Sequence, residues 1–151
     1  MKKGVYTIML LFAIYHTMAQ SSRFELASMI DTAIQMKCQI SSPRKVPHYI
    51  YLPGTKYDYS DHLSLGNEYN FIFIDIFNPL IKNLLKKRLK VWKVGIRQYG
   101  ELLDIHISEV SCKHLKNNGY DMLTTKTTYD TFRYDYALKK WSLLSTYDKM
   151  D

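Results

Sequence analysis

Residues 102–112 read Leu-Leu-Asp-Ile-His-Ile-Ser-Glu-Val-Ser-Cys, and apolar and polar side chains alternate along most of this stretch. Successive side chains of a β-strand point to opposite faces, so the stretch predicts a strand with one buried face. The residues expected to face the core are Leu103, Ile105 and Ile107. Those expected to face outward are Asp104, His106 and Ser108. This alternation is typical of an antiparallel sheet that is covered on one face.

Three further strands are predicted around this one. A second alternating run starts at Trp92 and reaches a turn at residues 99–100. Residues 116–119, Lys-Asn-Asn-Gly, tolerate the positive φ angles of a tight turn and precede a Thr- and Tyr-rich strand over 120–136. A last hairpin turns near residues 137–140 and returns through a strand that begins at Trp141. Together these strands predict an antiparallel meander.

Two helices are predicted before the meander. Ser22-Arg23-Phe24-Glu25 has the form of a capping box and begins a helix over residues 22–40. The apolar residues that recur every three or four positions in it are Phe24, Ala27, Ile30, Ile34 and Cys38. Asn78-Pro79 fits an N-cap followed by proline at the first helical position, which predicts a short second helix over 79–88.

The segment between the helices is harder to assign. Pro43, Pro47 and Pro53 disfavour helix, so residues 41–67 are expected to form a long loop with one extended piece at residues 48–52. Residues 69–77 read Tyr-Asn-Phe-Ile-Phe-Ile-Asp-Ile-Phe, with both faces apolar. A central strand and a buried helix both satisfy that pattern, and the strand is the preferred interpretation.

The predicted fold class is α+β, with the N-terminal helix and the short second helix packed on one face of an antiparallel four- to five-stranded meander. The chain has 151 residues, of which 46% are hydrophobic and 23% charged. These values exclude disordered and collagen-like classes. After removal of a leader, about 132 residues remain, which predicts a single domain over 20–151.

The first 19 residues predict an export signal. Lys2 and Lys3 form a basic start, and Val5 to Tyr15 form an apolar run that is too short for a membrane span. Thr17-Met18-Ala19 supplies the small residues of a cleavage site, so cleavage before Gln20 is expected, with a retained membrane anchor as the alternative. The mature protein is expected to be periplasmic or secreted, without a transmembrane anchor, and basic, with a net charge of about +5.

Cys38 and Cys112 are the two cysteines of the chain. Their number excludes a disulfide-dense scaffold and a zinc site with three or four thiolates. In an oxidising compartment they could form a disulfide, because a helix packed on the meander could bring them together. Two buried free thiols are the alternative, since Cys38 lies on the apolar stripe of its helix.

No catalytic, metal or cofactor site is predicted. Asp104, His106 and Ser108 share a strand face, but parallel side chains nearly 7 Å apart do not converge as a catalytic relay requires. Asp58, Asp61 and His62 cluster in the long loop without the spacing of a metal motif. Turn-forming Asp residues explain that cluster equally well, because they hydrogen-bond their own backbone.

Two surfaces are candidates for binding. Seven cations and no acid lie between Lys82 and Arg97, a segment that favours an anionic glycan or lipid of the cell envelope, or an acidic protein. The anion-binding candidates are Lys86, Lys87, Arg88 and Lys90. The aromatic loop candidates are Tyr49, Tyr51, Tyr57 and Tyr59. A solvated helix end and ordinary strand tyrosines are the plainer explanations of the same residues.

The sequence therefore favours an exported, non-enzymatic binding or interaction domain. The alternative is a small hydrolase-like envelope enzyme with its site in the concave face of the sheet. Acidic groups or histidines that converge in one deep apolar pocket would indicate the enzyme, whereas a flat aromatic or basic surface would indicate binding. The export signal argues against nucleic acid as the partner.

Overall fold

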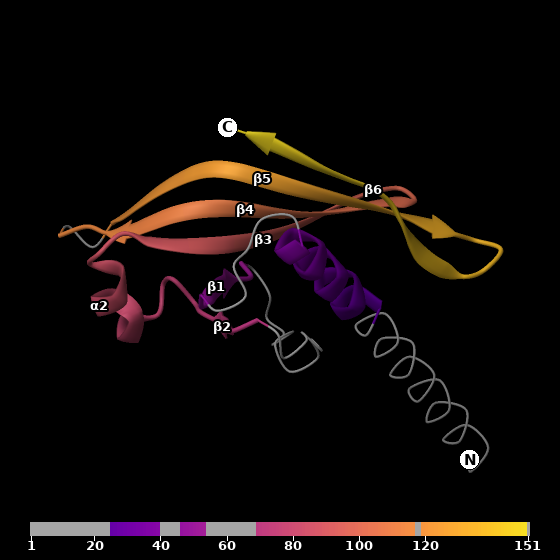
Figure 1. Ribbon diagram of the computed structural model, residues 1–151. Helices are drawn as coiled ribbons and strands as arrows, with labels where there is room; N and C mark the ends of the chain where they lie inside the picture. Colours follow the sequence, from indigo (N-terminus) through magenta and orange to yellow (C-terminus); the bar gives the residue numbers. More distant parts are fainter. Residues whose placement is uncertain (1–24, 40–45, 54–68, 117–118, 151) are drawn as a thin grey trace, which may run out of the picture.

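The computed structural model describes residues 25–39, 46–53, 69–116 and 119–150. In these ranges, a six-stranded sheet has the strand order β2-β1-β3-β4-β5-β6, and a helix over residues 25–39 packs against it (Figure 1). The strands are β1 (His48–Tyr51), β2 (Phe71–Phe73), β3 (Leu89–Tyr99), β4 (Leu102–His114), β5 (Tyr120–Asp135) and β6 (Lys140–Met150). The fold class is α+β, as the sequence predicts.

The predicted meander is confirmed. Strands β3, β4, β5 and β6 pair antiparallel with their neighbours in chain order, and β5 covers almost the whole predicted span of 120–136. Gly100 has a φ of 56°, which an L side chain rarely adopts, and it forms the turn between β3 and β4. These strands were predictable because alternation and turn residues are local signals.

The first two strands correct the prediction, because they make the sheet mixed and six-stranded. β1 lies parallel to β3, and β2 lies parallel to β1. Of residues 69–77, only Phe71–Phe73 form a strand, and that strand is at the edge of the sheet rather than at its centre. The extended run ends because the Asn78 N–H donates to the Asp75 carbonyl in a turn.

The second helix is shorter than predicted and lies on the other side of the sheet. The Asn78 side chain accepts from the Leu80 N–H, as an N-cap does, and begins the 3-10 helix η2 (Pro79–Ile81). The α-helix α2 (Lys82–Leu85) follows and ends before residue 88, because β3 begins at Leu89. The 25–39 helix agrees with the described part of the predicted 22–40 helix.

The main core lies between the 25–39 helix and the sheet. Its buried helix residues include Ile30, Ala33, Ile34 and Cys38. Its buried strand residues are Ile50, Trp92, Val94, Leu103, Ile105, Ile107 and Phe132. Leu103, Ile105 and Ile107 thus face the core, as their alternation predicts. We call this side of the sheet the helix-covered face.

A smaller core lies on the opposite face, at one end of β3 and β4. It joins Ile76 and Leu85 to Val91 and Cys112, with Leu85 supplied by α2. Val91 and Trp92 are adjacent in β3 but belong to different cores, since neighbouring strand residues point to opposite faces. The predicted packing of both helices on one face is therefore wrong.

The two cysteines are free and buried, one in each core. A Cys38–Cys112 disulfide, one of the two alternatives from the sequence, is not formed because the sheet lies between the two thiols. Burial raises the pKa of Cys38 to about 11, and burial also raises the pKa of Cys112. Both groups are therefore protonated and unreactive at neutral pH.

A β-bulge changes the face that β5 presents. Glu109 pairs with Lys126 but Val110 pairs with Thr124, so Thr125 is the extra residue. The insertion brings Leu123 to the same face of the sheet as Glu109, because it reverses the alternation. The strand also bends at such a position, which leaves a hollow beside the bulge.

The predicted export signal over 1–19 and most of the predicted loop over 41–67 lie outside the described residues. The extended piece expected at 48–52 is present as β1. None of the helices in the described ranges is both long and apolar enough to cross a membrane.

Candidate functional site

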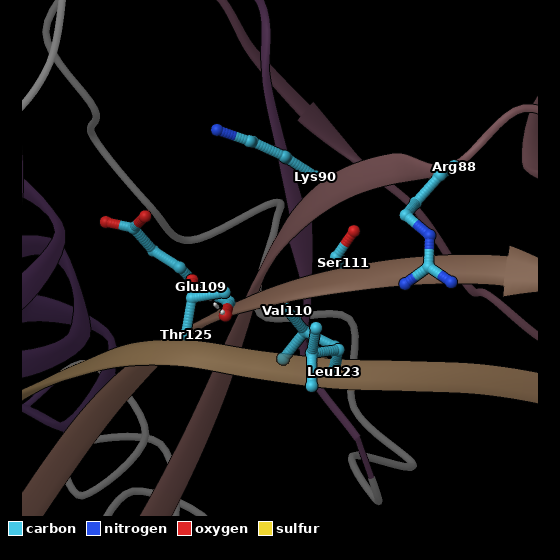
Figure 2. A pocket seen from close by; sticks show the side chains of 7 residues that line it. All are labelled: Arg88, Lys90, Glu109, Val110, Ser111, Leu123 and Thr125. Atoms are coloured by element: carbon cyan, nitrogen blue, oxygen red, sulfur yellow. Dashed lines mark hydrogen bonds between the residues drawn. The ribbon is translucent and has the colours of Figure 1, made fainter. Parts of the chain in front are cut away.

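The hollow at the bulge is a cleft of about 520 Å³ on the helix-covered face (Figure 2). Its lining combines two cations and one acid with hydroxyl and apolar side chains. The lining residues are Arg88, Lys90, Glu109, Val110, Ser111, Leu123 and Thr125. Two of the four predicted anion-binding residues, Arg88 and Lys90, therefore reach one cleft.

The cations of the cleft do not converge. Figure 2 shows Lys90 extended away from Arg88, with the two side chains on opposite sides of Ser111. Arg88 forms an ion pair with Asp121 of β5, so its charge is already matched within the chain. Lys86 and Lys87 are exposed and do not line the cleft. The structure thus separates the four residues that the sequence grouped.

Glu109 connects this cleft to a buried ammonium group. Lys37 of the 25–39 helix has a side chain with 0% exposure, and its Nζ lies 2.8 Å from Glu109 Oε1. The same Nζ donates to Thr128 Oγ1 at 3.0 Å. Burial of an ammonium group is costly unless an opposite charge and hydrogen-bond acceptors surround it, and Glu109 and Thr128 supply them.

The polar contacts continue across β5 and β6. Thr128 donates to Asp148 Oδ1 at 2.6 Å, and Lys126 pairs with Asp148 Oδ2 at 2.6 Å. Burial opposes ionisation of Asp148, but the hydrogen bonds from Lys126 and Thr128 outweigh it and lower the pKa of this carboxyl. We call Lys37, Glu109, Thr128, Asp130 and Asp148 the buried polar cluster, after its buried members Lys37, Thr128 and Asp130; Glu109 and Asp148 are partly exposed.

Asp130 is the least compensated member of the buried polar cluster. Its side chain is fully buried, Oδ1 accepts from Thr146 at 2.6 Å, and Oδ2 has no hydrogen-bond partner. Burial raises the pKa of Asp130 despite the Thr146 hydrogen bond. The cluster joins the 25–39 helix to the sheet. Glu109 is its one carboxylate that lines the cleft, and Glu109 forms an ion pair with Lys37. The described lining therefore contains no acid–base pair.

The opposite face of the sheet carries an aromatic row. Gly95, His106, Tyr129 and Tyr147 are direct register partners across β3, β4, β5 and β6. The His106 and Tyr129 ring centroids are 5.9 Å apart, and those of Tyr129 and Tyr147 are 5.0 Å apart and stacked at 9°. We call these three rings the aromatic row, and the surface around them the open face.

Gly95 is required for the position of His106. A Cβ atom at residue 95 would lie 2.2 Å from His106 Nε2, so the imidazole lies directly over the glycine backbone. Burial lowers the pKa of His106, and the Arg97 and Lys93 charges lower it further. At neutral pH the imidazole is therefore uncharged and continues the row as an aromatic ring.

Cations flank the aromatic row on both sides. Lys93 and Lys149 are at the two ends of the neighbouring row, which also contains Ser108 and Thr127. Arg97 is on the other side, two residues beyond Gly95 on β3. Successive residues on one face of a strand are about 7 Å apart, so each cation row is one such step from the rings.

Arg97 is held by its own strand. Its Nη1 donates to the Tyr99 hydroxyl at 2.9 Å, and its guanidinium carbon lies 5.9 Å from the Tyr99 ring centroid. The hydrogen bond to Tyr99 raises the pKa of Arg97, which stays charged. A small hollow of about 40 Å³ opens beside it. The hollow is lined by Arg97, Tyr99, Asp104, His106 and Tyr129.

The other sequence candidates are not brought to either surface. Tyr49 and Tyr51 are in β1 and pack against the smaller core. Tyr57 and Tyr59, and the loop cluster of Asp58, Asp61 and His62, lie outside the described residues. In the described ranges, no group of three or more His, Cys, Asp or Glu side chains is placed to hold a metal ion.

The aromatic row was missed by the sequence analysis, although His106 was assigned to the outward face. Tyr129 and Tyr147 join His106 only through strand register, and a single sequence does not specify register. Their period-two spacing from Thr127, Thr131, Ser145 and Lys149 is the signal that could have placed them on one polar face. No protein-family model, curated protein or solved structure matches this chain.

Proposed function

We propose that this protein is an exported, non-enzymatic binding domain that recognises an anionic ligand on the open face of its sheet. The observation that carries the proposal is the aromatic row with cations on both sides. Lys93, Arg97, Arg133 and Lys149 lie on this face with two acids of the described strands, Asp104 and Asp135, and Asp135 is the register partner of Lys140, so the surface is basic. Asp104 in addition accepts a hydrogen bond from Thr131.

The small size of the hollow on the open face favours binding over catalysis. The one hollow described on it, of about 40 Å³, is too small to enclose a substrate, whereas ligand pockets usually exceed about 300 Å³. The larger cleft at the bulge holds only Glu109 as a possible acid or base, and Lys37 is bound to it. A binding domain needs exposed aromatic area and matched charge, and the open face offers both.

The experiment compares two triple variants of the full-length chain on an anionic matrix. One removes open-face cations, K93Q/R97Q/K149Q, and the other removes sequence-predicted cations, K86Q/K87Q/K90Q. Both change the net charge by the same amount. We expect the open-face variant to lose retention and the matched control to keep most of it, because the open-face cations lie together beside the rings.

Salt dependence is the second readout. Retention of the wild-type protein should fall as salt increases from 0.1 M to 1 M, over which the screening length shortens from about 10 Å to about 3 Å. Equal loss in the two variants would show that only net charge matters. Loss confined to the control variant would move the binding surface to the basic segment over residues 86–90 and overturn the proposal.

A further inference from the structure

Resting on the proposed function, we infer that the ligand is a carboxylated glycan, of which one sugar ring packs on the exposed outer side of Tyr147 and one carboxylate binds Arg97. The aromatic row supplies apolar area for the rings, and the flanking cations supply charge for the acid groups. The register row of Gly95, His106, Tyr129 and Tyr147 spans four strands, which suits an extended polymer better than a compact ligand.

The ring contact is assigned to the outer part of the row. Tyr147 is 53% exposed on the edge strand β6 and stacks on Tyr129 behind it. Tyrosine offers a large, rigid contact area with little conformational entropy to lose. Its hydroxyl can also hydrogen-bond a sugar hydroxyl, and Ser145 and Thr131 of the adjacent row add further hydroxyl groups. This mixture of ring and hydroxyl chemistry matches a sugar.

The carboxylate contact is assigned to Arg97 and the small hollow beside it. The hollow has the volume of a few water molecules, which admits a carboxylate but not a nucleobase, and because Asp104 also lines it, the carboxylate is assigned to the side formed by Arg97 and Tyr99. Tyr99 orients the guanidinium through Nη1 and leaves its other N–H groups available for a two-point contact with a carboxylate. The pre-oriented side chain loses less freedom on binding than an unsupported arginine would.

The charge pattern also favours a polymer over a single sugar. Lys93 and Lys149 lie on one side of the rings and Arg97 lies on the other. In an extended polyuronate with alternately flipped rings, carboxylates project to both sides of the chain. Such a polymer can therefore meet the cations on both sides at once, and each added contact increases the effective concentration of the next.

The test measures the dissociation constant of the full-length protein for a polyuronate and for the same polymer after its carboxyl groups are reduced to alcohols. We expect the reduced polymer to bind at least about tenfold more weakly, since its charge-assisted hydrogen bonds are lost. R97Q should weaken binding to the polyuronate by a similar factor. R97Q and the wild-type protein should bind the reduced polymer with the same dissociation constant, because this polymer lacks the carboxylate that Arg97 contacts.

Tyr147→Ser tests the ring contact, and K90Q is the control for a cation on the helix-covered face. We expect Y147S to weaken binding to both polymers by about three- to tenfold and K90Q to leave both unchanged. Circular dichroism melts of every variant separate lost binding from lost folding. Y147S with full affinity for both polymers would overturn the ring contact.

Three other anionic probes separate this inference from the proposed function. Inorganic polyphosphate, single-stranded DNA and phosphatidylglycerol vesicles carry negative charge without carboxylated sugars. Binding to one of these, with none to the polyuronate, would overturn the glycan and leave the open face as a site for another anion. No binding to any anionic probe would overturn both proposals.

Discussion

On the helix-covered face the ammonium of Lys37 is fully buried and lies 2.8 Å from Glu109, whereas on the open face Lys93 and Arg97 are exposed. Both faces belong to the same strands, and neighbouring residues of β3 and β4 alternate between them. Charge on the first face holds the helix to the sheet, and charge on the second is available to a partner. Substitutions should therefore affect stability on one face and binding on the other.

The sharpest test of this contrast is Lys37→Met. Removing Lys37 leaves Glu109 without its ammonium partner and Thr128 without a donor, but Glu109 is 29% exposed, so the cost should be near the lower end of the about 3–5 kcal/mol for breaking a buried pair. Urea denaturation at neutral pH measures the loss. Lys126→Gln is the matched control, because the Lys126–Asp148 pair is partly exposed and should contribute less than about 1 kcal/mol.

The double variant K37M/E109L separates the net contribution of the ion pair from the cost of leaving Glu109 unpaired. Replacing both partners by apolar side chains leaves no unpaired charge, so much of the lost stability should return. A K37M protein as stable as the wild type would show that the buried polar cluster does not hold the helix to the sheet.

Core truncation is expected to have a slightly smaller effect. Ile105→Ala removes a fully buried side chain of the main core and should cost about 2–5 kcal/mol. Ser145→Ala on the open face should change stability by less than about 0.5 kcal/mol, since the side chain is exposed. The comparison uses thermal melts of both variants. Equal costs would contradict the assignment of covered and open faces.

The parts of the fold that could be predicted depend on local signals. The strand from 102 to 112 was found because its alternation repeats over many residues, and the meander turns contain residues that tolerate positive φ. The position of residues 69–77 could not be found, because it depends on the parallel pairing of β1 with β3. That pairing joins segments about 40 residues apart, and nothing in either segment specifies the partner.

The candidate site likewise has features that local sequence predicts and features that depend on strand pairing. The outward direction of His106 was predicted from alternation, but its contacts with Gly95 and Tyr129 depend on register. The cations Lys86 to Lys90 were grouped by their closeness in sequence, yet Arg88 pairs with Asp121 of β5. Lys37 was not selected at all, since one lysine on a helix carries no sign of burial until its helix has been placed on the sheet.

Asp130→Asn tests the buried polar cluster through pH. Burial raises the pKa of Asp130 above its ordinary 3.8, so the native state holds this proton more tightly than the unfolded state. The resulting stability is complete below 3.8 and is lost as pH rises through the folded-state pKa. The Asn side chain is neutral at every pH and retains an oxygen that can accept from Thr146. D130N should therefore be more stable than the wild type at neutral pH.

Urea midpoints of D130N and the wild type, measured from pH 3 to pH 8, show which protein is more stable at each pH. The advantage of D130N should grow with pH and vanish at the acidic end, where Asp130 is protonated in both states. Asp148 has a lowered pKa and acts in the opposite direction, and it is present in both proteins; its charge helps to raise the pKa of Asp130, so D130N also removes that repulsion, which adds to the same trend with pH. A D130N protein that is less stable at neutral pH would mean that the charge of Asp130 is needed, for example to support Lys37.

Apart from the control variants, the smallest expected change in stability is at Gly95, where a substitution should act mainly on the open face. In Gly95→Ala the new methyl group would meet the end of the His106 ring at 2.2 Å, and a flexible side chain can move away at little cost. We expect a stability change of less than about 1 kcal/mol.

The larger effect of Gly95→Ala should be on His106. The imidazole should leave its half-buried position, so the pKa of His106 should rise toward its ordinary 6.5, because burial is the main cause of its lowering. Titration of the imidazole by NMR measures this shift, and polyuronate binding to the same variant reports whether the aromatic row needs His106 in place. An unchanged His106 pKa in G95A would show that the ring does not lie over the glycine, and the row would then consist of Tyr129 and Tyr147 alone.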